Sequence, residues 1–312
     1  MFETFSFLIF LALSIFLVVR SADFAIFYST KVAKSFLLPK YVLGFIVVAV
    51  IGILPEAFIS VSSALKDIPS FGLGTLFGSN VADLTLIFAL VVLISGRELK
   101  IESKIINNRF FYVAIIALPI IFGLNGYYSR PEGVILILAG FLFYFLILRK
   151  SGFSVDAVKE SFSARDIALL VISMATLLIG AHLTVQYGVD LAQSININPV
   201  IIGMFIVALG TTLPELLFSI RAAKHQHDSL ALGDILGTVV ADATIVVGIM
   251  AVIKPFVFQQ SIIYVTGVFM VLAISLLMYL MRSGRVLMKR EVFILLVFYL
   301  VFVSAELFIG IR

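Results

Sequence analysis

The chain is a succession of apolar runs, each about 20 residues long, separated by short segments that carry most of its charged residues. Runs of about 20 residues can cross a bilayer as helices, whereas a transmembrane β-barrel shows alternating segments of about ten residues. The pattern predicts ten transmembrane helices, over roughly 4–36, 41–65, 70–95, 107–125, 131–149, 166–193, 199–222, 230–253, 260–281 and 291–310. The predicted fold class is an all-α membrane protein, and the short connections leave no room for a soluble domain.

Composition agrees with this pattern. Hydrophobic residues make up 62% of the 312 positions and charged residues 13%, with a mean hydropathy of +1.19. A soluble domain carries about 25% charged residues. The sequence has no cysteine, which excludes a disulfide framework and a thiolate metal site. The first 20 residues have neither a basic segment nor a small-residue cleavage site, so we expect them to belong to the first helix rather than to a signal peptide.

The sequence also contains an internal repeat at one constant spacing, here called the repeat offset, which is the interval from Glu56 to Glu215. Leu54-Pro55-Glu56 recurs at this offset as Leu213-Pro214-Glu215, and Asp83 recurs as Asp242. Between Ala22 and Thr85, 20 of 64 positions are identical to their counterparts without a gap. Because the matches include Pro, Glu, Asp and Gly, the ionisable residues are part of what was duplicated.

Lysine and arginine gather on one side of the predicted helices. With the N-terminus outside, 17 of them fall on the inner side and 4 on the outer side, and Arg20 lies within the first helix. The positive-inside rule then predicts a multi-pass protein of the cell membrane with both termini external. The same bias accounts for the formal net charge of +4, so we expect no nucleic-acid partner.

Ten helices in two copies give five helices per copy. Because five is odd, the second copy enters the membrane from the opposite side, and the halves form two inverted five-helix repeats, an architecture of many secondary transporters. We predict a first repeat over 1–150, a cytoplasmic connecting loop over 151–165 and a second repeat over 166–312.

Four carboxylates fall deep within the predicted helices: Glu56, Asp83, Glu215 and Asp242. A carboxylate at the bilayer centre costs at least about 2.5–3.5 kcal/mol on insertion scales, so each is a candidate functional residue. The four are two symmetric pairs, which an axis in the membrane plane can bring together. No lysine, arginine or histidine lies at comparable depth on the same four helices, so pairing with buried bases does not explain them.

Proline and hydroxyl residues extend this candidate site. Pro55 and Pro214 each remove a helical hydrogen bond beside a glutamate and thereby free backbone carbonyl oxygens. Such oxygens, with carboxylates and hydroxyls, suit hard cations such as Ca²⁺ and Na⁺. The candidate hydroxyls are Ser79, Thr211, Thr212 and Thr238. Their alternative role is to bond to the backbone of their own helix.

Two other features of these helices have structural interpretations. Glycines four residues apart, Gly74 with Gly78 and Gly233 with Gly237, predict close helix contacts. Asp234 follows Gly233 near the expected start of a helix, where N-capping is the expected role.

The motifs around the two glutamates resemble those of the cation/calcium exchanger superfamily, in particular the minimal prokaryotic type of its sodium/calcium exchanger branch. That family carries Gly-Thr-Ser-x-Pro-Glu on its second and seventh helices and a Gly-Ser-Asn segment on its third and eighth. The second repeat here reads Gly210-Thr211-Thr212-Leu213-Pro214-Glu215 and Gly237-Thr238-Val239-Val240-Ala241-Asp242. The first repeat reads Ile51-Gly52-Ile53-Leu54-Pro55-Glu56 and Gly78-Ser79-Asn80-Val81-Ala82-Asp83.

The resemblance implies an antiporter, not an enzyme, that exports Ca²⁺ against an inward flow of a monovalent cation. Glu56 and Glu215 would be the central Ca²⁺ ligands, flanked by Asp83 and Asp242. The remaining ligands implied for Na⁺ are the carbonyls of Ala49 and Ala208 with Ser79, Thr211, Thr212 and Thr238. Ca²⁺ and Na⁺ would be transported ions rather than cofactors, and the long first and sixth helices would slide against the other eight. The partners expected are inorganic cations and the lipid bilayer; the oligomeric state stays open, and a monomer is compatible with the sequence.

Departures from the family motif leave the coupling ion open. Gly52-Ile53 stands where the family has Thr-Ser, and Asp83 stands where an amide is common. Four carboxylates around one divalent ion do not all stay ionised, so a carboxyl such as Asp83 or Asp242 could carry a proton. We expect Na⁺ coupling first, with an H⁺-coupled exchanger of Ca²⁺ or another divalent cation as the alternative.

Two other classes are more distant alternatives. Leu232-Gly233-Asp234 faintly resembles the Gly-x-Gly-Asp pattern of intramembrane aspartyl proteases, although Ala231 stands where the first glycine belongs. That interpretation leaves both Pro-Glu pairs unexplained. A cation channel would use the same acids, and dependence of the flux on a counter-ion separates a carrier from a channel.

Overall fold

The computed structural model describes residues 2–35, 53–101, 105–106, 108–151, 163–226, 228–282 and 286–310. The elements of the first half are α1 (Phe2–Ser35), α3 (Leu54–Leu65), α4 (Pro69–Ala82), η1 (Asp83–Ile87), α5 (Phe88–Ser95), β1 (Leu99–Lys100), α7 (Arg109–Phe122), η2 (Gly123–Asn125), β2 (Tyr127–Tyr128) and α8 (Arg130–Ser151). Those of the second half are α9 (Ala164–Ser194), α10 (Pro199–Ile201), η3 (Ile202–Val207), α11 (Ala208–Thr211), α12 (Leu213–Lys224), α13 (Asp228–Ala241), η4 (Asp242–Val246), α14 (Val247–Ile253), β3 (Phe256–Val257), η5 (Ile262–Gly267), α15 (Val268–Arg282), β4 (Val286–Leu287) and α16 (Lys289–Gly310).

Long apolar helices dominate the described part of the chain, which confirms the all-helical membrane class. Eight described stretches are long and apolar enough to cross a bilayer: Glu3–Ala25, Pro69–Ser95, Arg130–Ile147, Ala164–Ser194, Pro199–Lys224, Ala231–Ile253, Ile262–Arg282 and Arg290–Phe308. Two shorter apolar helices, Leu54–Leu65 and Arg109–Asn125, fall in the second and fourth predicted spans. The first part of the second predicted span lies outside the described residues, and the count of ten spans stays a prediction.

The repeat offset found in the sequence recurs in the bounds of the elements. The ranges 69–82 of α4, 83–87 of η1 and 130–151 of α8 recur as 228–241 of α13, 242–246 of η4 and 289–310 of α16. Helices α3, α5 and α7 likewise begin one repeat offset before α12, α14 and α15. The correspondence therefore extends well beyond the segment where the two sequences are visibly similar.

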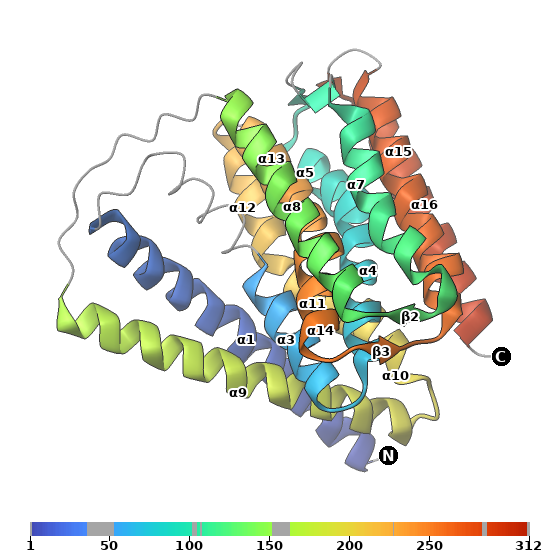
Figure 1. Ribbon diagram of the computed structural model, residues 1–312. Helices are drawn as coiled ribbons and strands as arrows, with labels where there is room; N and C mark the ends of the chain where they lie inside the picture. The colour runs from blue at the N-terminus through green and yellow to red at the C-terminus, as the bar shows by residue number, and fades with distance from the viewer. Residues whose placement is uncertain are drawn as a thin grey trace.

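Helices α1 and α9 form a pair that lies side by side, inclined to the remaining helices (Figure 1). Gly180 of α9 allows this approach, because a Cβ there would lie 3.2 Å from the backbone nitrogen of Val18. The side chains of Ser163 and Asp166 form a capping box at the start of α9. Lys31 Nζ of α1 donates to Asp166 Oδ1 at 2.9 Å and ties the two helices together. Both are longer than a bilayer requires, with 34 and 31 residues, as predicted.

The core of the bundle lies around the two continuous stretches that run from α4 to α5 and from α13 to α14. In the most apolar 18-residue segment of each stretch, 78% and 89% of the segment is buried. The corresponding fractions are 33% in α1 and 28% in α9. The more exposed apolar side chains of α1, α8, α9 and α16 are typical of surfaces that face lipid.

Two short antiparallel strand pairs join the two halves of the chain, a feature that the sequence analysis did not predict. Leu99 pairs with Leu287 at one end of the bundle, and Tyr128 pairs with Phe256 at the other. Each pair links a connection of the first half to a connection of the second half.

Glycines on α4 provide the first test of this packing. A Cβ at Gly78 would lie 2.4 Å from the backbone oxygen of Met204, so Gly78→Ala forces α4 and η3 apart. We expect a loss of about 1–3 kcal/mol in unfolding free energy, measured by thermal or denaturant unfolding in detergent. The control is Gly233→Ala on α13, which should keep or raise stability because no other part of the described chain lies within 4 Å of a Cβ there. Equal effects of the two changes would contradict the packing.

Candidate cation site

Two glutamates sit at matching helix starts in the two halves of the chain. Glu56 lies in the first turn of α3 and Glu215 in the first turn of α12, each directly after a proline. Proline favours the first helical turn because that turn's N–H groups have no helical partner. The positive end of the helix dipole also favours a carboxylate at this position.

The structure shows where the prolines lie in the predicted spans. Pro214 lies in the first turn of α12, directly after α11, and Pro55 lies in the first turn of α3, whose preceding segment falls outside the described residues. Thr212, with φ −78° and ψ −3°, separates α11 from α12 within the predicted helix 199–222. The break thus lies directly before the Pro-Glu pair of the second half.

The two aspartates occupy matching π-helical turns. Asp83 opens η1 and Asp242 opens η4, each at the end of a regular helix. The N–H groups of Phe88 and Val247 donate to their carbonyl oxygens, five residues back. Single π-turns inside helices occur frequently at functional sites. Nothing in the sequence signals this turn other than the aspartates themselves.

All four acids are buried, with exposures of 1% for Glu56, 0% for Asp83, 4% for Glu215 and 0% for Asp242. Asp83, Glu215 and Asp242 each lie within electrostatic range of Glu56. The structure therefore places the predicted acids around one region of the bundle core, at the junction of its two halves.

Most oxygens of these carboxyl groups have no protein partner. Among the described residues, no donor reaches Glu56 Oε1 and Oε2, Asp83 Oδ1 and Oδ2, Asp242 Oδ1 and Oδ2, Glu215 Oε2 or Asn80 Oδ1. The ion pairs found in the described ranges involve other acids: Asp23, Asp67, Asp166 and Asp228. A buried polar atom without a partner costs about 1–3 kcal/mol, so eight in one region need another source of stabilisation.

Three of the four predicted hydroxyls donate to the backbone of their own helices. Ser79 donates to the oxygen of Leu76 at 2.9 Å, Thr211 to that of Ala208 at 3.0 Å and Thr212 to that of Leu209 at 3.2 Å. Their lone pairs stay available as acceptors for a cation. Thr238 is buried at 2% exposure.

Of the two predicted carbonyl ligands, the structure describes only that of Ala208. The carbonyl of Ala208 accepts from the hydroxyl of Thr211 and from the N–H of Thr212 at 3.1 Å, so both of its lone pairs are engaged. Ala49 and Gly52 lie outside the described residues.

The acids are near one another without forming a ready-made metal cluster. Across the ranges that the structure describes, no three acidic or histidine side chains meet at the spacing of metal ligands. A cation held here therefore needs hydroxyl or carbonyl oxygens as well, or a closer approach of the four acids.

Two polar residues near the site have roles that the sequence analysis missed. Asn80 is fully buried, and its Nδ2 lies 3.5 Å from Met270 Sδ. Asp234 was expected to cap a helix start, but α13 begins at Asp228 and places Asp234 inside the helix. The spacing of four between Asp234, Thr238 and Asp242 was the available signal that they share a face.

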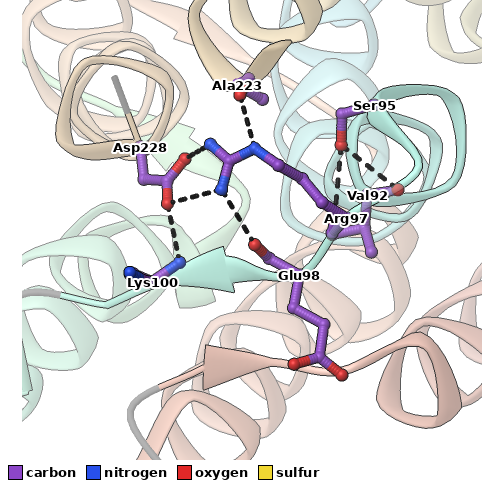
Figure 2. Close-up of polar contacts among 7 residues, drawn as sticks. All are labelled: Val92, Ser95, Arg97, Glu98, Lys100, Ala223 and Asp228. Carbon is purple, nitrogen blue, oxygen red and sulfur yellow. Dashed lines mark hydrogen bonds and ion pairs between the residues drawn. The ribbon is translucent and has the colours of Figure 1, made fainter. Parts of the chain in front are cut away.

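The turn that joins α12 to α13 is fixed by Arg97, which follows α5 (Figure 2). Its Nε donates to the carbonyl of Ala223 at 2.7 Å, and its terminal nitrogens bind both carboxylate oxygens of Asp228, at 3.1 Å for Nη1 to Oδ2. The N–H of Lys100 donates to the same carboxylate at 2.9 Å. These contacts hold the end of α12 against the start of α13.

A more exposed ion pair joins the two halves of the chain at the other end of the bundle. Lys254, after α14, pairs with Asp67 in the turn between α3 and α4, and both side chains are exposed, at 42% and 76%. The corresponding fractions for Arg97 and Asp228 are 27% and 8%. The two ends of the bundle therefore differ in how firmly the halves are joined.

Comparison with known proteins places the chain in a family. The sequence profile of the family described as "Sodium/calcium exchanger protein" matches residues 6–149 and again residues 166–308. Because these matches cover most of the chain, the protein belongs to the sodium/calcium exchanger protein family.

Individual relatives and a solved structure agree with this family. The sodium/calcium exchanger MaX1 of Methanosarcina acetivorans is 24% identical over 98% of this chain and 99% of its own length. The inner membrane protein YrbG of Escherichia coli is 27% identical over 78% of this chain and 79% of its own. A solved structure of the sodium-calcium exchanger NCX_Mj superposes with a TM-score of 0.66 at 22% identity, covering 96% of this chain and 98% of that one. The chain therefore has the same fold as this exchanger.

Removal of Arg97 tests whether the turn is held as described. Arg97→Ala leaves Asp228 buried without its charged partner, and we expect the unfolding free energy to fall by about 2 kcal/mol. Arg97→Lys should recover only part of this loss, because lysine lacks the planar guanidinium group that binds both carboxylate oxygens. The control Lys254→Ala removes the exposed pair and should cost less than about 1 kcal/mol. A cost for Arg97→Ala no larger than for Lys254→Ala would refute the role of this contact.

Proposed function

We propose that this protein is a secondary antiporter that exports Ca²⁺ in exchange for Na⁺ at a carboxylate site in the middle of the membrane. The observation that carries the proposal is a set of buried carboxylate oxygens that have no donor among the described residues, on Glu56, Asp83, Glu215 and Asp242. Membership in the sodium/calcium exchanger protein family supports the substrate class. The same membership agrees with the expectation that the chain is not an enzyme.

The proposed architecture is ten membrane-spanning helices in two inverted five-helix repeats, with both termini outside the cell. The constant repeat offset between matching helix bounds supports the two repeats. The described helices and the 17-to-4 distribution of lysine and arginine support the even count and the orientation.

Exchange follows from the energetics of the site. Bare carboxylates are costly in a low-dielectric interior, so a change of conformation that seals the site needs bound cations to neutralise them. Ca²⁺ and Na⁺ then compete because both use the oxygens of Glu56 and Glu215. The protein switches sides when loaded and does not switch when empty, which couples the two fluxes.

The pair α1–α9 is the proposed moving element. An apolar cleft separates part of α1 from η3, α11 and α12, with Leu11, Ile15 and Gly210 among its lining residues. A Cβ at Gly210 would lie 2.7 Å from Ile15 Cγ2, so α1 passes directly over the motif of the second half. Apolar side chains on a smooth helix face allow sliding with little loss of polar contacts.

Coupling to H⁺ is a second candidate, favoured by one feature of the first half. Position 53, which corresponds to Thr212, is the buried apolar Ile53, and Asp83 adds an ionisable group nearby. The first half therefore offers fewer neutral oxygens for Na⁺ and one more group that can bind a proton.

Removal of either central carboxylate tests the site. Glu56→Gln or Glu215→Gln removes a charged ligand, and we expect uptake of ⁴⁵Ca²⁺ into vesicles to fall about 100-fold or more, in line with the loss of a buried charge pair. The control Glu98→Gln, at an exposed acid outside the site, should transport normally. Near-normal uptake by both variants would refute the site.

Imposed gradients test the coupling ion. A Na⁺ gradient at constant pH should drive ⁴⁵Ca²⁺ uptake, and a pH gradient without Na⁺ should not, because Na⁺ competes for the Ca²⁺ oxygens. Uptake driven only by the pH gradient would replace Na⁺ coupling with the H⁺-coupled alternative.

A further inference from the structure

Asp234 is a fifth acid beside the proposed site. On α13 and the start of η4, Asp234, Thr238 and Asp242 follow one another at intervals of four residues and therefore share a helix face. Asp234 is half-buried, whereas Thr238 is 2% exposed and Asp242 is 0% exposed. Exposure along this face therefore falls, in steps of about 6 Å, from a partly buried acid to a sealed one.

Helix α12 supplies a hydroxyl group that faces Asp234. The hydroxyl of Ser219 lies 3.4 Å from Asp234 Oδ2, and Ser219 follows Glu215 by one helical turn. Asp234 is also within electrostatic range of Glu215 and of Asp83. Glu215, one turn before Ser219 on α12, carries the buried oxygen Oε2, which has no donor in the described part of the chain.

The matching position in the first half is closed and uncharged. Thr75, one repeat offset before Asp234, is fully buried and donates to the oxygen of Phe71 at 2.9 Å. A Cβ at neighbouring Gly74 would lie 2.7 Å from Val200 Cγ1, whereas a Cβ at Gly233 would have no neighbour within 4 Å among the described residues. The repeat is therefore broken here, with free space and a carboxylate in the second half only. The close contact expected at Gly233 from the sequence is wrong.

A purely structural role does not account for Asp234. The acid lies inside α13 and not at its start, so it caps no helix. Among the ion pairs of the described residues, none involves Asp234, although Arg97 lies near the same end of α13 with its charge on Asp228. A partly buried carboxylate with no ion-pair partner among the described residues can attract mobile cations.

We propose that Asp234 and Ser219 form an access subsite for the transported divalent cation, between Glu215 and the aqueous phase at the α12–α13 turn. The inference rests on the proposed function and adds a residue pair and a direction to it. Carboxylate and hydroxyl oxygens replace part of the hydration shell before the ion reaches Glu215 and Asp242. The matching position of the first half has no such acid, so the subsite makes the two faces of the membrane unequal.

The test measures half-saturating Ca²⁺ for exchange separately at each face of the membrane. Because the chain has no cysteine, Lys224→Cys at the exposed end of α12 marks the face of the α12–α13 turn for an impermeant maleimide. In this background, Asp234→Asn should raise half-saturating Ca²⁺ at that face about tenfold and leave the opposite face unchanged. Asp67→Asn is the matched control, since Asp67 is an exposed acid with φ +64°, a conformation that asparagine tolerates.

A second measurement detects the access route directly. A single cysteine at position 234 (Asp234→Cys) should react with a water-soluble cationic thiosulfonate from the α12–α13 face only. A cysteine at the matching position (Thr75→Cys) should stay unreactive from both faces. The two readouts remain informative if one variant folds poorly.

The outcomes separate the subsite from the function. Suppose that the wild type exchanges Ca²⁺ and that Asp234→Asn has the same half-saturating Ca²⁺ concentration at both faces. This result would overturn the subsite and leave the antiporter proposal standing. Equal labelling at positions 75 and 234 would also overturn the subsite. A wild type that moves no Ca²⁺ would overturn the proposed function and the subsite with it.

Discussion

The burial of four carboxyl groups that pair with no base in the described part of the chain is the constraint on which the rest of the structure depends. Unpaired carboxylate oxygens are costly in an apolar interior. At least seven of them lie on α3, η1, α12 and η4. The fold sustains this arrangement because each acid lies on a specialised helix segment. The glutamates begin helices after prolines, and the aspartates open π-helical turns. A cation site explains why such costly positions occur twice, at one spacing.

Much of the architecture was predictable from the pattern of apolar and charged residues, because the surrounding bilayer and water determine where each kind of residue can lie. Apolar run length predicted the membrane class, and the long first and sixth helices appear as α1 and α9. The repeat offset predicted that Glu56 and Glu215 would occupy equivalent positions, and the helix bounds repeat at the same offset. The acids were identifiable because a carboxylate in a membrane helix has few alternatives to a functional role.

Other features depend on tertiary context and left no local signal. The strand pairs join residues from opposite halves of the chain, such as Leu99 with Leu287, so no local pattern encodes them. The π-helical turns η1 and η4 begin at Asp83 and Asp242, and no other sequence pattern indicated them. Gly233 has the spacing of a packing glycine, but nothing in the described part of the chain approaches it. Ten spans, the coupling ion and the ligand roles of individual residues stay predictions.

Exchange requires that the two sides of the bundle differ at any moment, and the structure shows where repeat symmetry is broken. Arg97 and Asp228 form a largely buried clamp at one end, and Lys254 and Asp67 an exposed pair at the other. The most direct test of the proposed cation site is an anomalous difference map from crystals grown with Ca²⁺. We expect a strong peak among the carboxylates of Glu56 and Glu215, with Asp83 and Asp242 nearby. Ordered carboxyl groups without a peak between them, or Ca²⁺ bound only elsewhere, would contradict it.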